Sequence, residues 1–138
     1  MTETRALVVV GVDGSDESIK ATKWAADYAA ATGATLELVT AWRWPDLYGA
    51  LASIPNFDPK AEGQALLEKA AADLTLPDEQ VRLLVVNGFA TQVLTAQAAT
   101  ADLLVVGTRG LGGARSVLLG SVSNYCVHHA DCPVVVVR

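Results

Sequence analysis

The chain has 138 residues, of which 51% are hydrophobic and 18% are charged, so its composition fits one folded domain spanning 1–138 and argues against intrinsic disorder. Aromatic residues make up only 6%, so the core must consist mainly of Ala, Val and Leu. The formal net charge of −5 argues against a general nucleic-acid-binding protein, which would need a basic face.

The first predicted element is a strand over residues 6–12. Its sequence, ALVVVGV, is a continuous apolar run of the kind found in strands buried on both faces. The start of the chain lacks the basic segment and the long apolar stretch of a signal peptide. No run approaches the roughly 18 apolar residues that span a membrane. We therefore expect a cytoplasmic protein with no membrane partner.

A helix is predicted over residues 15–33. Ser15 or Asp16 can cap its start, acidic residues fill its first turn, and Gly33 can end it. Four residues near helical spacing are expected to form its apolar face. They are Ile19, Trp24, Ala25 and Tyr28.

The second predicted strand covers residues 34–42. It is followed by a Pro-rich segment with mixed aromatic residues, which we interpret as a surface loop that contains at most a short helical turn. Asp58 and Pro59 form a good cap and first-position pair, so they are expected to open a second helix that ends before Pro77.

The rest of the chain alternates in the same way. A strand over 80–88 precedes a short helix over 91–101 with Thr91 as its expected cap, and a fourth strand covers 102–108. After a glycine-rich loop come a helix over 121–131, with Ser121 as its expected cap, and a last strand over 132–138. Such alternation predicts an α/β fold: an open doubly wound five-stranded parallel sheet with helices on both faces.

In such a sheet, ligands bind outside the carboxyl ends of the strands where the strand order reverses. Asp13 stands at the tip of the first strand, and the glycine-rich loop follows the fourth. If these two strands flank the reversal point, Asp13 and the loop meet in space. They are the first place to look for a site.

The glycine-rich loop lies between Val105 and Ser123 and contains five of the chain's eleven glycines. Glycine lets the backbone approach a ligand closely, and Gly120 and Ser121 stand where the fourth helix begins. Free N–H groups and the hydroxyls of Ser121 and Ser123 could converge there on phosphate oxygens. The alternative is a flexible connector with a helix cap at its end.

Two common nucleotide signatures are absent from the sequence. No lysine follows the loop glycines as a P-loop requires, and the first strand–helix turn lacks the GxGxxG fingerprint of dinucleotide-binding folds. A response-regulator phosphoacceptor is also disfavoured, because the chain lacks an acidic cluster at the first strand tip and a lysine after the last strand.

Asp13 has more than one interpretation. It can be a cap or hydrogen-bonded turn residue, or a carboxylate that contacts a ribose or base edge or holds Mg²⁺ against phosphates. Trp42 and Trp44 could cover a base or simply pack on the core. No nucleophile–base pair with a supporting third group is found, so the sequence favours binding over catalysis.

The histidines and cysteines give only weak signals. His128 and His129 are neighbours near a helix end, where they point about 100° apart and do not readily chelate a metal. Cys126 and Cys132 are not spaced as CxxC, and both are expected to be reduced, small apolar residues.

The loop pattern Gly107-x₂-Gly110-x₉-Gly120-Ser121 resembles the G-x₂-G-x₉-G-[ST] motif of the ATP-binding universal stress proteins. The resemblance extends to the opening VVVGVDGS, to ADLLVVGTRGLGG, to LLGSVS and to the closing DCPVVVV. It covers essentially the whole chain, and the segment from Arg43 to Pro59 is the least similar part.

The resemblance implies the strand order 3-2-1-4-5 and a site for ATP with Mg²⁺. Asp13 would lie near ribose, phosphate or the metal, Thr40 and Ala41 would border the adenine with Val12, and the loop would hold the phosphates. It also implies a homodimer through the last strand, Pro133–Val137. The implied binding residues are Val12, Asp13, Ser15, Thr40, Ala41, Gly107, Arg109, Gly110, Gly120, Ser121, Val122 and Ser123.

Three functions follow as hypotheses. The first is an ATP-binding stress-response sensor or regulator with slow or no hydrolysis. The second is an ATPase or nucleotidyl-transfer enzyme on the same fold. The third is a dimeric interaction module in which the loop is only a rigid turn.

Overall fold

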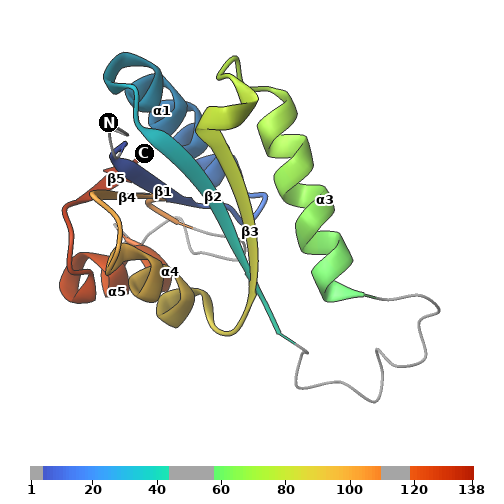
Figure 1. Cartoon of the computed structure of the whole chain (residues 1–138). Coiled ribbons are helices and arrows are strands. Elements are labelled where there is room, and N and C mark those ends of the chain that lie inside the picture. Colours follow the sequence, from blue (N-terminus) through green and yellow to red (C-terminus); the bar gives the residue numbers. More distant parts are fainter. Residues whose placement is uncertain (1–4, 44–57, 110–118) are drawn as a thin grey trace.

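The computed structural model describes residues 5–43, 58–109 and 119–138, and it confirms the predicted fold. Five parallel strands form one sheet in the order β3-β2-β1-β4-β5 (Figure 1). The strands are β1 (Leu7–Gly11), β2 (Thr35–Trp42), β3 (Val81–Asn87), β4 (Leu103–Gly107) and β5 (Val134–Val137). The helices are α1 (Asp16–Thr32), α3 (Pro59–Ala72), α4 (Ala90–Ala98) and α5 (Ser121–His129), with a 3₁₀ turn, η1, at Asp78–Gln80.

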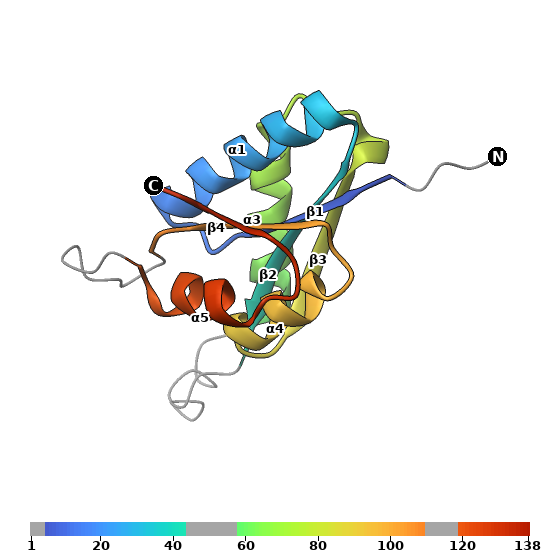
Figure 2. The same ribbon diagram turned by 90° about the vertical axis from the view of Figure 1, so that its left-hand side faces the viewer.

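Helices cover both faces of the sheet (Figures 1 and 2). One apolar core lies between the sheet and the pair α1 and α3, and a second lies between the sheet and the pair α4 and α5. Side chains alternate between them along β1, where Val8 and Val10 face α1 and Val9 faces the opposite core. The apolar run at the start of the chain is therefore buried on both sides, as predicted.

The two helices on the α1/α3 face begin as the sequence predicted. Ser15 is the N-cap of α1, and its side chain accepts a hydrogen bond from the Ser18 N–H at 3.2 Å. Asp58 caps α3 by accepting from the N–H groups of Lys60 and Ala61, with Pro59 at the first helical position. Gly33 ends α1 with a left-handed φ of 76°, a conformation that side chains disfavour.

The expected caps of the other two helices are wrong. Helix α4 begins at Ala90 after Phe89, so Thr91 lies inside it, and its carbonyl accepts from the Thr95 hydroxyl. The N-cap of helix α5 is Gly120, one residue before the expected Ser121. The Gly120 N–H donates a hydrogen bond to the Thr108 carbonyl at 2.6 Å, which fixes the chain at this residue. Ser121 is therefore the first helical residue.

The predicted apolar face of α1 is also wrong, except at Ala25. Ile19, Trp24 and Tyr28 are 46%, 38% and 40% exposed, and the rings of Trp24 and Tyr28 stack on each other on the surface. The buried face consists of small residues, which are Ser18, Ala21, Thr22, Ala25, Ala26 and Ala29. Small side chains let the helix axis approach the sheet closely. The short distance between helix and sheet therefore determines which side of α1 is buried.

No helix in the described ranges is long and apolar enough to cross a membrane. The sheet has two edges, β3 and β5. All four residues of β5 are half-buried valines, so this edge strand is apolar.

Candidate functional site

A cavity of about 100 Å³ opens at the C-terminal ends of β1, β2 and β4, beside the first turns of α4 and α5. We call it the strand-end cavity. It lies where the strand order reverses, the place that the topology predicts for a ligand. The described residues that line it are Gly11, Val12, Asp13, Ser18, Val39, Thr40, Ala41, Ala90, Leu94, Val106, Gly107, Arg109, Val122 and Ser123.

Most of the predicted binding residues meet at this cavity. Eight of them line it, namely Val12, Asp13, Thr40, Ala41, Gly107, Arg109, Val122 and Ser123. Ser15, Gly120 and Ser121 lie in the adjoining helix starts and are not among its described lining residues. Gly110 falls outside the described residues. Strands one and four thus meet in space, as the sequence argument required.

Other lining residues were not predicted. Ala90 and Leu94 belong to α4, and Gly11, Val39 and Val106 are apolar strand residues on the same face of the sheet. The sequence predicted a short helix over residues 91–101, but a predicted helix alone does not show which cavity it closes.

The β1–α1 turn holds Asp13 at the cavity wall. Oδ1 of Asp13 accepts a hydrogen bond from the Ser15 N–H at 2.8 Å, which is the pattern of an Asx-turn. The Asp13 N–H in turn donates to the Ser18 hydroxyl at 3.4 Å. Asp13 is therefore a hydrogen-bonded turn residue, which was one of its two interpretations, and it also lines the cavity.

The two helices that adjoin the cavity differ from the other two at their N-termini. Within the described ranges, neither α4 nor α5 has a side-chain hydrogen bond to its first N–H groups, whereas Ser15 and Asp58 supply such bonds in α1 and α3. Ala90 of α4 and Val122 of α5 both line the cavity. Two partially positive helix starts therefore adjoin the same space.

Ser123 is 2% exposed and joins β4 to α5. Its hydroxyl lies 2.8 Å from the Thr108 carbonyl and 3.1 Å from the Gly120 carbonyl, and it donates to these acceptors. This proton is thus used within the protein, and the Ser123 oxygen keeps its capacity to accept. The main-chain N–H groups of the first turn are the better donors for an anion.

Gly107 owes its missing side chain to α1. A Cβ built there would lie 2.8 Å from the carbonyl carbon of Glu17, closer than real Cβ atoms come. Gly107 lines the strand-end cavity, but the position that its Cβ would take points to α1 on the opposite face of the sheet. Close packing of α1 on β4 is sufficient to require glycine here.

Two residues beyond Gly107, the chain carries Arg109. Its Nη2 lies 3.0 Å from Oε1 of Glu17 in the first turn of α1, and the two side chains are 27% and 20% exposed. Arg109 is also among the residues that line the cavity. This ion pair therefore joins the edge of the cavity to α1.

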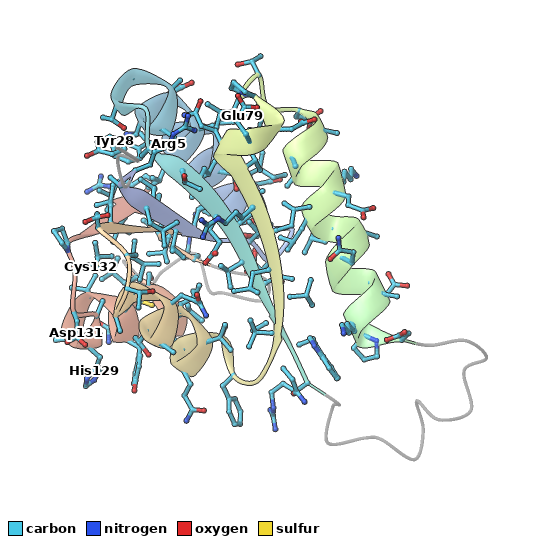
Figure 3. All side chains as sticks on the ribbon, in the orientation of Figure 1. Arg5, Tyr28, Glu79, His129, Asp131 and Cys132 are labelled. Carbon is cyan, nitrogen blue, oxygen red and sulfur yellow. The ribbon has the colours of Figure 1, made fainter. Side chains whose placement is uncertain are left out.

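The remaining candidates from the sequence lie elsewhere. His129 ends α5 and Cys132 precedes β5 (Figure 3). Both therefore lie near the N-terminal end of β5, whereas the cavity lies at the C-terminal ends of the strands. Burial raises the pKa of the Cys126 thiol to about 11, with a further contribution from Cys132, so Cys126 is a core thiol rather than a nucleophile. In the described part of the chain, no group of three His, Cys, Asp or Glu residues could hold a metal. Trp42 is half-buried on β2, and Trp44 lies outside the described residues.

A second cavity of about 120 Å³ lies on the other face, between α1 and α3, and we call it the helix cavity. Its walls are mainly apolar, with Lys23, Lys69 and Asp73 among its lining residues. Val12 lines both cavities, so the β1–α1 turn separates them.

Comparison with known proteins agrees with this architecture. The sequence model of the Universal stress protein family matches residues 6–138. Universal stress protein Rv2005c of Mycobacterium tuberculosis is 38% identical over 138 residues, covering 96% of this chain and 45% of that protein. This chain thus spans about half the length of that mycobacterial relative.

A relative of similar length comes from Thermus aquaticus. This universal stress protein, named for the 3′ region of a QAH/OAS sulfhydrylase, is 35% identical over 133 residues, covering 95% of this chain and 97% of the relative. Among solved structures, a universal stress protein in complex with cAMP is 32% identical, with a TM-score of 0.65 over 99% of this chain and 98% of that one.

Proposed function

The chain belongs to the universal stress protein family, and we propose that its strand-end cavity binds an adenine nucleotide. We propose that the protein acts as a nucleotide-dependent sensor or regulator in the stress response. One observation carries the proposal: the helix starts of α4 and α5, without described side-chain caps, adjoin the same cavity as the tips of β1 and β2. Such starts attract phosphate, and apolar strand tips suit a base. The cAMP complex of a relative supports a nucleotide ligand.

The residues suggest how a nucleotide would be oriented. Val12, Thr40 and Ala41 would border the adenine, because they form the cavity wall at the tips of β1 and β2. The N–H groups of Ser121, Val122 and Ser123 would bind phosphate together with the loop residues Gly110 and Gly120. Asp13 would contact the ribose or phosphate region.

We propose ATP with Mg²⁺ as the physiological ligand. Mg²⁺ in nucleotide sites takes one or two carboxylates and completes its shell with phosphate oxygens and water. Asp13 is the one carboxylate among the described lining residues, so the donor set fits a metal that arrives with its nucleotide. The metal would neutralise phosphate charge. The described residues offer no nucleophile–base pair, so we propose slow or no hydrolysis.

We further propose a cytoplasmic homodimer that pairs through Pro133–Val137. Strand β5 is an edge of the sheet and consists of four half-buried valines. An unpaired apolar edge promotes aggregation, and pairing with a second copy satisfies both its backbone and its side chains. Both cysteines are free, which agrees with a reducing compartment.

Denaturing mass spectrometry of freshly purified protein tests the ligand, followed by calorimetry with ATP, ADP, AMP and cAMP, each with and without Mg²⁺. We expect a co-purified or titratable adenine nucleotide. Gly110→Val should abolish binding without unfolding the protein, because its side chain would enter the phosphate path. Normal ATP binding by that folded variant would contradict the assignment of the loop.

A further inference from the structure

The Glu17–Arg109 ion pair connects two segments that are 92 residues apart in the sequence. Arg109 is, with Asp13, one of two charged residues among the described residues that line the strand-end cavity. Its guanidinium lies 3.0 Å from the Glu17 carboxylate. The only cation that the described cavity offers to a phosphate is therefore already paired with an anion.

The position of Glu17 is fixed by packing. The backbone of Glu17 lies so close to Gly107 that a Cβ on the glycine would come within 2.8 Å of the Glu17 Cβ and carbonyl carbon. The turn before it is held by the Ser15 cap. The backbone that carries the Glu17 carboxylate is thus packed against the end of β4, two residues before Arg109.

The charges decide which ligand this arrangement favours. Asp13, Glu17 and Arg109 together carry a net charge of about −1, because the two carboxylates outnumber the guanidinium by one. A ligand that brings many phosphate charges must share Arg109 with Glu17 and also approaches both carboxylates. A ligand of low charge meets a smaller electrostatic penalty.

We propose that Glu17 determines the charge specificity of the nucleotide site: by holding Arg109, it disfavours free polyphosphates and selects nucleotides of low net charge, either monophosphates or polyphosphates already neutralised by Mg²⁺. This inference rests on the proposed nucleotide site. It identifies Glu17, which lines no part of the described cavity, as a residue that acts through Arg109.

Glu17→Gln tests the proposal because it removes the charge and keeps the size and helix propensity of the side chain. Calorimetry without Mg²⁺ would compare cAMP, AMP, ADP and ATP. We expect tighter binding in proportion to ligand charge, from about twofold for cAMP to about tenfold for ATP, because each added unit of charge contributes a similar factor. With Mg²⁺ the gain for ATP should shrink.

Asp16→Asn is the matched control. Asp16 is exposed and lies in the same first turn, and its substitution removes the same charge. Within the described residues, the ion pair of Arg109 is with Glu17 and not with Asp16. We expect it to change each affinity by less than about twofold, because exposed charges are screened.

Arg109→Gln completes the cycle. If Glu17 acts mainly through Arg109, the gain in ATP affinity from Glu17→Gln should be much smaller in the Arg109→Gln background than in the wild-type background. Thermal unfolding of each variant would show that the fold persists. Equal gains for all four nucleotides, equal effects of Glu17→Gln and Asp16→Asn, or a full gain without Arg109 would overturn the inference.

These outcomes separate the two proposals. Wild-type protein that binds nucleotides but shows any of the three contrary results overturns the role of Glu17 alone. Absence of nucleotide binding in wild type and in every variant overturns the proposed function and this inference with it.

Discussion

The two faces of the sheet are built differently. On one face lie α1 and α3, with 17 and 14 residues, and both begin at a side-chain cap. On the other lie α4 and α5, with nine residues each and no described side-chain cap (Figure 2). Long capped helices satisfy their own termini and stabilise the fold, whereas short helices without such caps leave donors for a ligand.

The cavities repeat this contrast. The helix cavity lies between packed helices and is lined mainly by apolar residues, with Lys23, Lys69 and Asp73 as its charged residues. The strand-end cavity combines strand tips, helix starts and Asp13. Their volumes are nearly equal, about 120 and 100 Å³, so size does not distinguish them and the polar groups do. Three pairs of substitutions test how far the contrast between the two faces holds.

The largest expected effect is on the α1/α3 face. Gly107→Ala should destabilise the protein by about 1–3 kcal/mol, because its Cβ would meet the backbone of Glu17, which cannot move aside. Gly11→Ala is the comparison on the α4/α5 face, since the nearest atom there, also at 2.8 Å, is a methyl group of the Leu94 side chain. Rotation of that side chain should limit the loss to less than about 1 kcal/mol.

Urea unfolding of the two variants measures both values. A loss for Gly11→Ala as large as that for Gly107→Ala would show that the α4/α5 face is packed as rigidly as the other. The expected difference between a contact with backbone and a contact with a rotatable side chain would then be absent.

The next effect concerns binding. Ala41→Trp places a large ring in the strand-end cavity and should weaken nucleotide binding at least about tenfold, because the ring occupies the ligand's space. Ala70→Leu adds bulk to the helix cavity and should leave nucleotide affinity unchanged, with stability equal or higher by roughly 0.5–1 kcal/mol. Calorimetry with ATP and thermal unfolding of both variants give the readout. Loss of binding in Ala70→Leu with normal binding in Ala41→Trp would exchange the roles of the cavities.

The sequence predicted those parts of the molecule that depend on short-range signals. Continuous valine and leucine runs identify buried strands, and Ser15 and Asp58 cap helices through residues two or three positions away. The strand tips and the loop also marked most of the cavity wall. These features can be predicted without knowing which residues pack against them.

The missed features depend on distant contacts. The buried face of α1 is made of small residues because the helix approaches β4 at Gly107, and nothing near Trp24 or Tyr28 in the sequence reveals that approach. The cap of α5 is set by Thr108, twelve residues before Gly120. Glu17 lies far from Arg109 in the sequence, so a local pattern could not identify it.

The smallest effect concerns a buried carboxylate on β2. Glu37 is 7% exposed, and within the described residues its Oε1 has no hydrogen-bond partner. Val9 of β1 and Arg82 of β3 are its cross-strand neighbours. Burial raises the pKa of Glu37, and the Arg82 charge only partly offsets this rise. A buried ionised carboxylate is thus a cost that the α4/α5 face tolerates.

The sign of the pH dependence follows from the raised pKa. The folded protein binds this proton more tightly than the unfolded chain, so Glu37 favours folding most at pH values below its ordinary pKa. That contribution is lost as the pH rises through the raised pKa of the folded state. Glu37→Gln should therefore raise the melting temperature at pH 8, and the gain should disappear near pH 4. Glu79→Gln, at an exposed position labelled in Figure 3, is the control and should change the melting temperature little at either pH. A lower melting temperature for Glu37→Gln at pH 8 would mean that the carboxylate and Arg82 form a stabilising pair, and the α4/α5 face would then be as well satisfied as its opposite.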